Sequence, residues 1–424
     1  MKKILIFLLV TVFAVSMFFI GIGCRQPEVI IETVVETVTE IVEVEVEVEV
    51  PAEVYPPVTI EGTVYPIGLG PGGHEFTPSS DIYLEDHNLD YYIEMARSGD
   101  YSFAENASDE IKEAVKGKTA AIVMHWLPDD WTQLQIKGIS ETLEAYGVEV
   151  VSITGAEFIA EKQIANLENV MTMGVDIIFA AAVDVAAEGP IFQEVADSGI
   201  EFILTTVLPD GMEWPDDYTA NVASTDRGLG IVAADQMAHF FEEMGKTEAL
   251  VGILDVNFPV PNNIERVIGF TSRCAELYPW IEIGPTVLYN GTMESAYEFS
   301  EGTLTARTDL DGFFCDWAGP AYEMSNAARV AGYDPNEFVI TTVDLTEYIA
   351  LEMASDGFVK GVGAQDPYAC GVAEAICAVK SFLGEDNAPY ITTNGYGVTK
   401  NNLVESFEYL LLRQPPEDIM AFLE

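Results

Sequence analysis

The sequence predicts an α/β protein built from two doubly wound lobes, each around a parallel sheet. From Thr119 onward, short runs rich in Val, Ile and Phe alternate with segments of helical period. Near-continuous apolar strands separated by helices are typical of parallel sheets that are covered on both faces. Nine or more such runs fall in this part of the chain. That is more than one core comfortably holds, so two lobes are expected.

The expected strands share a largely apolar run and cover residues 120–124, 149–153, 176–181, 202–206, 218–223, 249–254, 286–289, 312–315, 338–343 and 361–364. The expected helices share an apolar face and cover residues 133–146, 162–173, 227–244, 263–277, 321–331 and 370–383. Open parallel sheets bind ligands beyond the carboxyl ends of their strands, so the residues after each strand are the candidates for function.

Polar and aromatic side chains gather at these strand ends. They are His125, Trp126, Asp129, Trp131, Asp226, Arg227, Asn257, Asn262, Asn263, Arg266, Asn290, Asp316, Trp317, Asp344, Gln365 and Asp366. Carboxylates and amides pair with hydroxyl groups, and aromatic faces stack on the CH faces of a sugar ring. For single residues such as Asp226 and Asp344, helix capping is the alternative. The coincidence of so many at one edge indicates a ligand site.

Residues 1–23 have the layout of a secretory signal peptide. Lys2 and Lys3 precede an apolar run over 4–20, and small residues follow directly before Cys24. This arrangement resembles the lipobox of bacterial lipoproteins, in which the cysteine is acylated, although Gly21 stands where Leu is usual. A plain signal peptide or an uncleaved anchor are the alternatives. Each of the three places the body of the protein outside the cytoplasm.

Residues 24–57 predict a stalk, and residues 58–117 a lead-in segment. Glu recurs among β-branched residues over 28–50, a pattern that favours an extended chain over a helix. An edge strand added to another protein's sheet is the alternative. The glycine-rich stretch 68–73 is expected to be a loop, because a phosphate cradle needs a helix directly after it. Residues 88–97 and 108–115 are expected to form short helices on the body.

Composition excludes several classes of partner and site. The chain has 19 basic and 70 acidic residues, for a net charge of −51, and such a field repels nucleic acid and anionic lipid headgroups. No C-x-x-C pair is present, so no zinc site is expected, nor any other metal or cofactor. The remaining cysteines are expected to be small buried apolar residues: Cys274, Cys315, Cys370 and Cys377.

From about Lys118 to Asn402 the chain resembles the type I periplasmic sugar-binding proteins of ABC importers, the ribose/galactose-binding group. The matching segments are DDWTQLQIKGI, NVASTDRGLGIVAADQMA, NNIERVIGF, DGFFCDWAGPAYEMSNAARVAGY, ITTVDLT, KGVGAQDPYACGVAEAICAVKSFLGE and GYGVTKNN. The resemblance implies two lobes joined by a three-strand hinge, with crossings near 244–248, 364–366 and 390–393. The N-lobe would be 118–244 plus 366–389, and the C-lobe 245–364 plus 391–412.

The resemblance also implies a set of ligand-binding residues. Asp129 and Trp131 would come from the first loop, and Asp226 and Arg227 would grip vicinal hydroxyls. The other lobe and the hinge would supply Arg266, Asp316, Asp344 and Gln365, while Trp126 and Trp317 would add stacking surface. Asp129 and Asp316 occupy places where the ribose binders carry Asn. Ribose is therefore less expected than a polyol, a different aldose or an amino-bearing ligand.

The predicted function is an extracytoplasmic solute-binding lipoprotein, held at the membrane by lipid on Cys24. It would act as a monomer and deliver a small sugar to an ABC transporter permease. A receptor subunit for a membrane kinase or chemoreceptor is the main alternative, followed by a nucleoside or autoinducer-type binder. A surface glycosidase would need a carboxylate pair such as Asp316 and Asp344. The sequence contains no nucleophile elbow, zinc helix or P-loop, so no enzyme is expected.

Overall fold

The structure is a computed structural model that describes residues 77–258 and 260–423. The expected signal peptide, the lipidation site Cys24 and the stalk lie outside these described residues. Within the described part of the chain, no helix has both the length and the apolar character to span a membrane.

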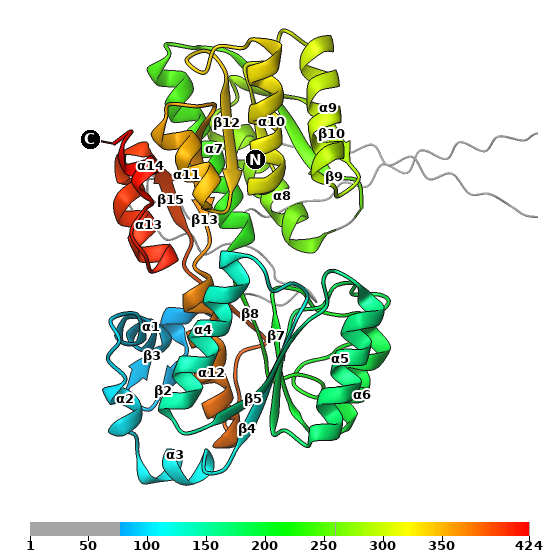
Figure 1. Cartoon of the computed structure of the whole chain (residues 1–424), viewed down its shortest axis with the longest axis vertical. Helices are drawn as coiled ribbons and strands as arrows, with labels where there is room; N and C mark the ends of the chain where they lie inside the picture. The colour runs from blue at the N-terminus through cyan, green and yellow to red at the C-terminus, as the bar shows by residue number, and fades with distance from the viewer. Residues whose placement is uncertain (1–76, 259, 424) are drawn as a thin grey trace, which may run out of the picture. The chain divides into compact units, whose positions relative to one another are not determined.

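The first lobe is built on a seven-stranded sheet in which every neighbouring pair of strands is parallel. In spatial order the strands are β1 (Thr77–Pro78), β14 (Tyr390–Thr393), β8 (Ala220–Ser224), β7 (Glu201–Thr205), β6 (Ile177–Ala180), β4 (Thr119–Met124) and β5 (Glu149–Gly155). One face is covered by α5 (Ala160–Met173) and α6 (Gly189–Asp197), the other by α4 (Asp130–Ala145) and α12 (Pro367–Phe382). Figure 1 shows this doubly wound arrangement.

The second lobe is built on a six-stranded sheet with one antiparallel edge strand. Its order is β10 (Ile281–Tyr289), β9 (Ala249–Val256), β11 (Gly312–Cys315), β12 (Val339–Val343), β13 (Val359–Ala364) and β15 (Tyr396–Thr399), and only β15 runs antiparallel to its neighbour. One face carries α7 (Asp226–Glu243) and α8 (Pro261–Leu277), and the other carries α9 (Met293–Ala306), α10 (Ala318–Ala331) and α11 (Glu347–Ala354). The two doubly wound lobes predicted from the sequence are therefore confirmed.

The chain crosses between the two sheets after β8, after β13 and between β14 and β15. The first crossing differs from the expected one near 244–248, because α7 packs on α8 and on the second sheet. Buried residues lie on almost every face of α7. The pattern of apolar residues along this helix therefore does not indicate which sheet it packs against. The third crossing falls at Asn394–Gly395, since all of β14 pairs with β8.

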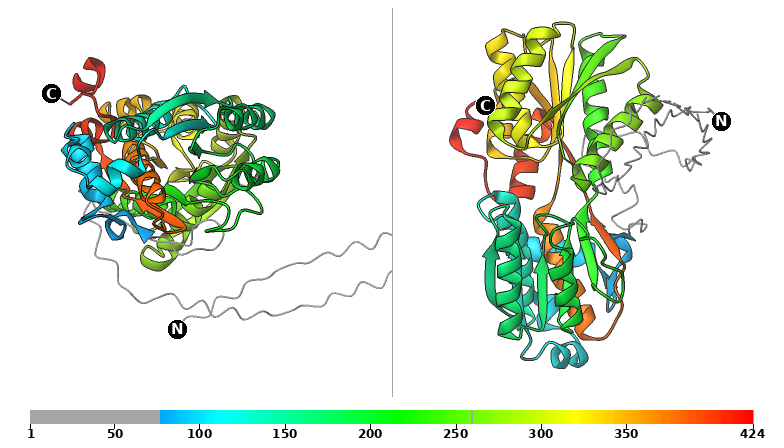
Figure 2. Two further views of the ribbon diagram at one scale, coloured as in Figure 1. Left: turned by 90° about the horizontal axis from the view of Figure 1, so that it is seen from below. Right: turned by 90° about the vertical axis from the view of Figure 1, so that its right-hand side faces the viewer.

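The segments that flank the two lobes each pack mainly on one lobe (Figures 1 and 2). The hairpin of β2 (Tyr83–Leu84) and β3 (His87–Asn88) and the helices α1 (Leu89–Arg97), α2 (Ser102–Glu105) and α3 (Asp109–Ala114) belong with the first lobe, where α1 and α3 contact α12. The C-terminal helices α13 (Leu403–Leu411) and α14 (Glu417–Met420) pack against α11 of the second lobe. The short helices predicted in the lead-in are confirmed.

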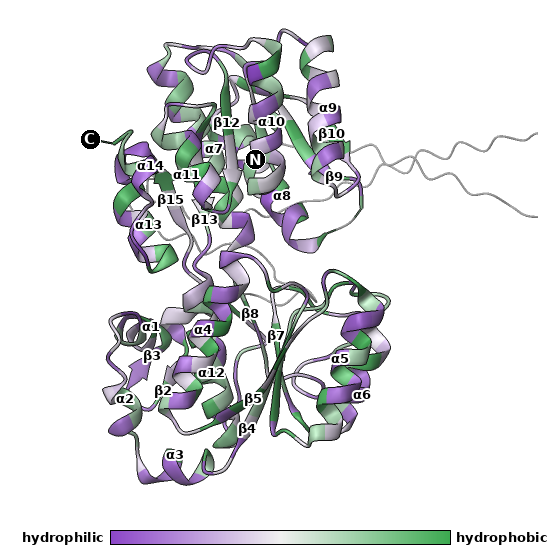
Figure 3. Ribbon diagram, in the orientation of Figure 1, coloured by the Kyte–Doolittle hydropathy of each residue, from purple (hydrophilic) through white to green (hydrophobic). Residues whose placement is uncertain are grey.

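All ten expected strands are present, and β10 begins earlier than expected. A register shift between Ile283 and Thr286 interrupts its pairing with β9, and the sequence there contains Gly-Pro. Among the described residues, six helices lie outside the expected ranges: α2, α6, α9, α11, α13 and α14. Hydrophobic residues face the sheets and polar residues face outward along most helices (Figure 3).

Cys274, Cys315, Cys370 and Cys377 are buried and free, as predicted.

Candidate ligand-binding site

A buried network centred on Arg266 lies at the carboxyl ends of the second lobe's strands. The Arg266 side chain on α8 is only 4% exposed, and its Nε donates to Asp226 Oδ1 at 2.8 Å. Its Nη1 donates to the carbonyl oxygen of Asp316 at 3.2 Å and lies 3.8 Å from Asp344 Oδ2. Four of the predicted site residues, far apart in the sequence, therefore meet around one guanidinium group.

Two glycines allow this approach of α7 to α8. A Cβ atom on Gly230 would lie 2.0 Å from the carbonyl oxygen of Arg266, and one on Gly269 would lie 2.1 Å from that of Arg227. The helices cross closely enough at these points to bring Arg266 against Asp226, the first residue of α7. Burial raises the pKa of Asp226, and the adjacent guanidinium opposes this effect.

Asp316, directly after β11, is fully buried and accepts hydrogen bonds from protein groups. Its Oδ2 accepts from Asn263 Nδ2 at 2.8 Å and from the Tyr289 hydroxyl at 3.2 Å. The Trp317 indole in turn donates to the Tyr289 hydroxyl at 2.7 Å. Burial and the neighbouring Asp255 raise the pKa of Asp316 well above its usual range. This environment suits a residue that orients Trp317 and Arg266 better than one that contacts ligand directly.

Asp344 is the more accessible carboxylate of the network, with a side chain 21% exposed. It has a φ of 76°, a left-handed conformation that is uncommon for a residue other than glycine. Its backbone N–H donates to Gly363, and Gln365 Nε2 donates to its Oδ1 at 2.6 Å. These contacts hold Asp344 in a strained conformation directly after β12, and such strain is concentrated at functional sites.

Arg227 lies apart from this network. Its side chain is 27% exposed and forms an ion pair with Glu265 at 2.6 Å. Asp226 and Arg227 are adjacent on a helix, so their side chains leave the axis about 100° apart. In the structure Arg227 is paired with Glu265 and Asp226 with Arg266, so the two residues of this expected pair have different protein partners.

The first lobe contributes aromatic and neutral groups after β4. The Trp126 ring stacks on Phe158, with centroids 5.1 Å apart, and Trp131 meets His125 edge to face at 6.2 Å. Burial lowers the pKa of His125 to about 4, so this imidazole is neutral at neutral pH. Phe158, 59% exposed, was not among the predicted site residues. It follows β5 in a loop whose sequence carries no motif.

Asp129 caps α4, because its Oδ1 accepts a hydrogen bond from the backbone N–H of Thr132 at 2.8 Å. This is the capping role that a carboxylate at a strand–helix junction is expected to have. The cap uses one carboxylate oxygen of Asp129, and the side chain is otherwise exposed.

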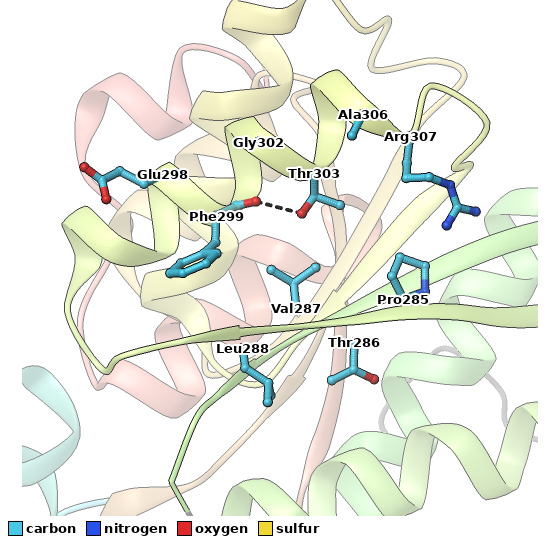
Figure 4. A pocket seen from close by; sticks show the side chains of 10 residues that line it. All are labelled: Pro285, Thr286, Val287, Leu288, Glu298, Phe299, Gly302, Thr303, Ala306 and Arg307. Atoms are coloured by element: carbon cyan, nitrogen blue, oxygen red, sulfur yellow. Dashed lines mark hydrogen bonds between the residues drawn. The ribbon is translucent and has the colours of Figure 1, made fainter.

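Two cavities lie away from these groups, since neither is lined by a predicted site residue. One, of about 510 Å³, lies between β10 and α9 and is lined by Leu288, Phe299 and Arg307 among others (Figure 4). The other, of about 660 Å³, lies between α1, α4, α12 and α13. Among the residues that the structure describes, no cluster of three or more His, Cys, Asp or Glu side chains could hold a metal ion.

Two parallel-sheet lobes with three crossings, and polar groups at the strand ends of both, define a two-lobed binding protein of type I topology. Residues 120–380 match the model of the periplasmic binding protein domain, and the chain belongs to this family. Proteins of the family bind solutes rather than catalyse reactions, in agreement with the prediction that this protein is not an enzyme. No curated protein sequence matches the chain.

Solved structures share this fold at low sequence identity. An ABC transporter solute-binding protein from Agrobacterium vitis, bound to α-D-tagatopyranose, is 21% identical with a TM-score of 0.61, over 68% of this chain and 96% of that one. A carbohydrate transporter solute-binding protein from Agrobacterium radiobacter, with D-arabinose, is 21% identical with a TM-score of 0.62, over 70% and 99%. A solute-binding protein from Bacillus halodurans, with myo-inositol, is 20% identical with a TM-score of 0.59, over 70% and 99%.

Proposed function

We propose that this protein captures a small sugar or polyol between its lobes and delivers it to the permease of an ABC importer. The proposal rests on two groups of side chains, one at the strand ends of each lobe, which we call half-sites. The second lobe offers buried carboxylate, amide and guanidinium groups around Arg266, and the first offers aromatic rings. The family and the sugar-bound structures of similar fold support the same ligand class.

The two half-sites divide the recognition of a sugar ring. Asp226, Arg266, Asp344 and Gln365 would hydrogen-bond its hydroxyl groups, since carboxylates and guanidinium groups form short, charge-assisted bonds. Trp126 and Trp131 would stack on its CH faces from the first lobe. Trp317, whose indole is hydrogen-bonded to Tyr289, would stack on the sugar ring from the second lobe.

The charges of the half-sites favour a neutral or amino-bearing ligand over an acidic one. Arg266 is already paired with Asp226 and lies near Asp344, and Arg227 is paired with Glu265. An anionic ligand would have to compete with these carboxylates in a chain of net charge −51.

Lipid on Cys24 would keep the binding protein at the outer face of the membrane, close to its permease. The support for this part is the sequence around Cys24 and the family, whose members work outside the cytoplasm. A monomer is sufficient for this role, because both half-sites come from one chain.

The proposal is tested by thermal unfolding of the chain from residue 51 in the presence of a panel of pentoses, hexoses and inositols. A ligand at 100 times its Kd adds about 2.7 kcal/mol to the stability of the folded protein. One or more members of the panel should raise the unfolding temperature, and Asp226→Ala should abolish that rise while Arg227→Ala keeps it. A complete absence of shifts with all of these compounds would contradict the proposed ligand class.

A further inference from the structure

Two basic residues outside the family-matched residues 120–380, Arg97 and Arg413, connect the first lobe to the second. Arg97 ends α1, which packs on the first lobe, and Arg413 follows α13, which packs on the second. Each contacts groups from both lobes, in segments that the family model does not cover.

Arg97 is buried at the second crossing of the chain. Its side chain is 7% exposed, and its Nη2 donates to Asp366 Oδ2 at 2.5 Å. Asp366 caps α12 directly after β13, where the chain passes between lobes. The Arg97 Nη1 donates to the carbonyl oxygen of Tyr409 on α13, and the guanidinium lies 4.0 Å from the Tyr409 ring centre. The Tyr409 hydroxyl donates back to Glu94 on α1 at 2.6 Å.

Arg413 bridges two carboxylates on opposite lobes. Its Nη2 donates to Asp130, the first residue of α4, at 3.1 Å and to Glu347, the first residue of α11, at 3.0 Å. All three side chains are partly exposed, Arg413 at 38%. Without the guanidinium between them, Asp130 and Glu347 would repel each other.

A cavity of about 660 Å³ lies beside these contacts and is lined by both arginines together with Tyr101, Lys137, Tyr368 and Tyr409. Polar and aromatic side chains from both lobes therefore surround an open space here. Polar contacts depend on distance and angle, and the exposed contacts of Arg413 can break without leaving a buried charge unpaired.

We propose that Arg97 and Arg413 are positioning residues that set the angle between the lobes, and so the distance between the two half-sites. Arg97 acts at the crossing itself, where a rotation of the lobes moves atoms least. Arg413 acts away from the crossing, where the same rotation moves Asp130 relative to Glu347, so its two contacts cannot both persist over a wide range of angles. This inference rests on the proposed capture of ligand between the lobes.

The angle is measured as a distance distribution between spin labels on Asp197→Cys and Glu301→Cys, one exposed position in each lobe. The full chain carries Cys24→Ser, and the other cysteines are buried, so labelling is selective. Without any ligand, Arg413→Gln should broaden or shift the distribution. The matched control is Arg307→Gln, which removes an equally exposed arginine paired with Asp309 inside one lobe, and should leave the distribution unchanged.

Salt gives a second readout that a purely structural role of Arg413 would not produce. Raising NaCl from 0.1 to 1 M shortens the screening length from about 10 Å to about 3 Å, and should move the wild-type distribution toward that of Arg413→Gln. The variant itself should not respond.

Arg97→Lys keeps the charge beside Asp366 but loses the bond to Tyr409, and should broaden the distribution further. If Arg97→Lys fails to fold, the distance distribution of Arg413→Gln still tests the proposal. An Arg413→Gln distribution identical to the wild type would overturn the proposal. Because no ligand is used, this result is independent of the sugar panel, and either proposal can fail alone.

Discussion

The two half-sites differ in how far their side chains are also needed for folding. In the second lobe, Arg266, Asp226 and Asp316 are buried and bonded to one another, so they serve the core and the site together. In the first lobe, Trp126 and Phe158 are partly exposed rings that pack on each other. Substitutions in the second lobe should therefore reduce stability as well as binding, whereas substitutions in the first should reduce binding alone.

The largest effect is expected from Arg266→Met in the second lobe. It leaves the buried Asp226 without its partner, and breaking a buried pair in this way costs about 3–5 kcal/mol of unfolding free energy. Arg227→Met, the control on the neighbouring helix, removes a half-exposed pair worth about 0–1 kcal/mol. Urea denaturation of both variants measures the difference, and equal losses would show that Arg266 is not the centre of the network.

The first lobe has a buried carboxyl of its own, whose effect should appear as pH dependence. Glu374 on α12 accepts hydrogen bonds from Thr205 Oγ1 and Gln135 Nε2, and burial raises its pKa from 4.5 to about 8. The folded state therefore holds this proton more tightly than the unfolded state. The stabilisation is complete below about pH 4.5 and is lost as pH rises toward about 8, a change on the order of a few kcal/mol.

Glu374→Gln should reduce the dependence of unfolding free energy on pH in that window, since the amide resembles the protonated acid; part of the slope should remain, because burial also raises the pKa of Glu188 to about 7. Glu276→Gln, an exposed residue, serves as the control and should leave the slope as it is. A slope in Glu374→Gln equal to that of the wild type would mean that other groups produce it.

The smallest effect is expected from the aromatic half-site. Trp126→Ala should weaken sugar binding by up to ~1.5 kcal/mol, or roughly tenfold, with little change in stability. Trp317→Ala should weaken both, because its indole is bonded to the buried Tyr289. Calorimetric titration and urea denaturation of the two variants check this contrast. Equal stability losses would remove the distinction between the half-sites.

Most of the fold could be predicted because continuous apolar runs mark parallel strands wherever both faces are covered. All ten expected strands are present on this ground. The first crossing could not be placed in the same way. Buried residues surround most of α7, and its contacts with α8 depend on Gly230 and Gly269, whose role appears only when the two helices are side by side.

The site could be predicted in part. Parallel strands place their carboxyl ends at one edge of a sheet, and this rule predicted that Arg266, Asp226, Asp344 and Gln365 lie close together. The structure brings these four residues into contact with one another. Sequence position alone does not show which way a side chain points. Arg227 therefore turned out to pair with Glu265, and Asp316 proved to be enclosed. Tyr289 and Phe158 were missed because an aromatic residue near a strand end is as common in cores as in sites.

The most direct test of the central claim, that both lobes hold one ligand, is calorimetric titration with the sugar that gives the largest thermal shift. The titration compares the wild type with Trp126→Ala from the first lobe and Asp344→Ala from the second. We predict one site per chain and weaker binding in both variants. Binding that is unchanged in either variant would contradict it, because the ligand would then depend on one lobe alone.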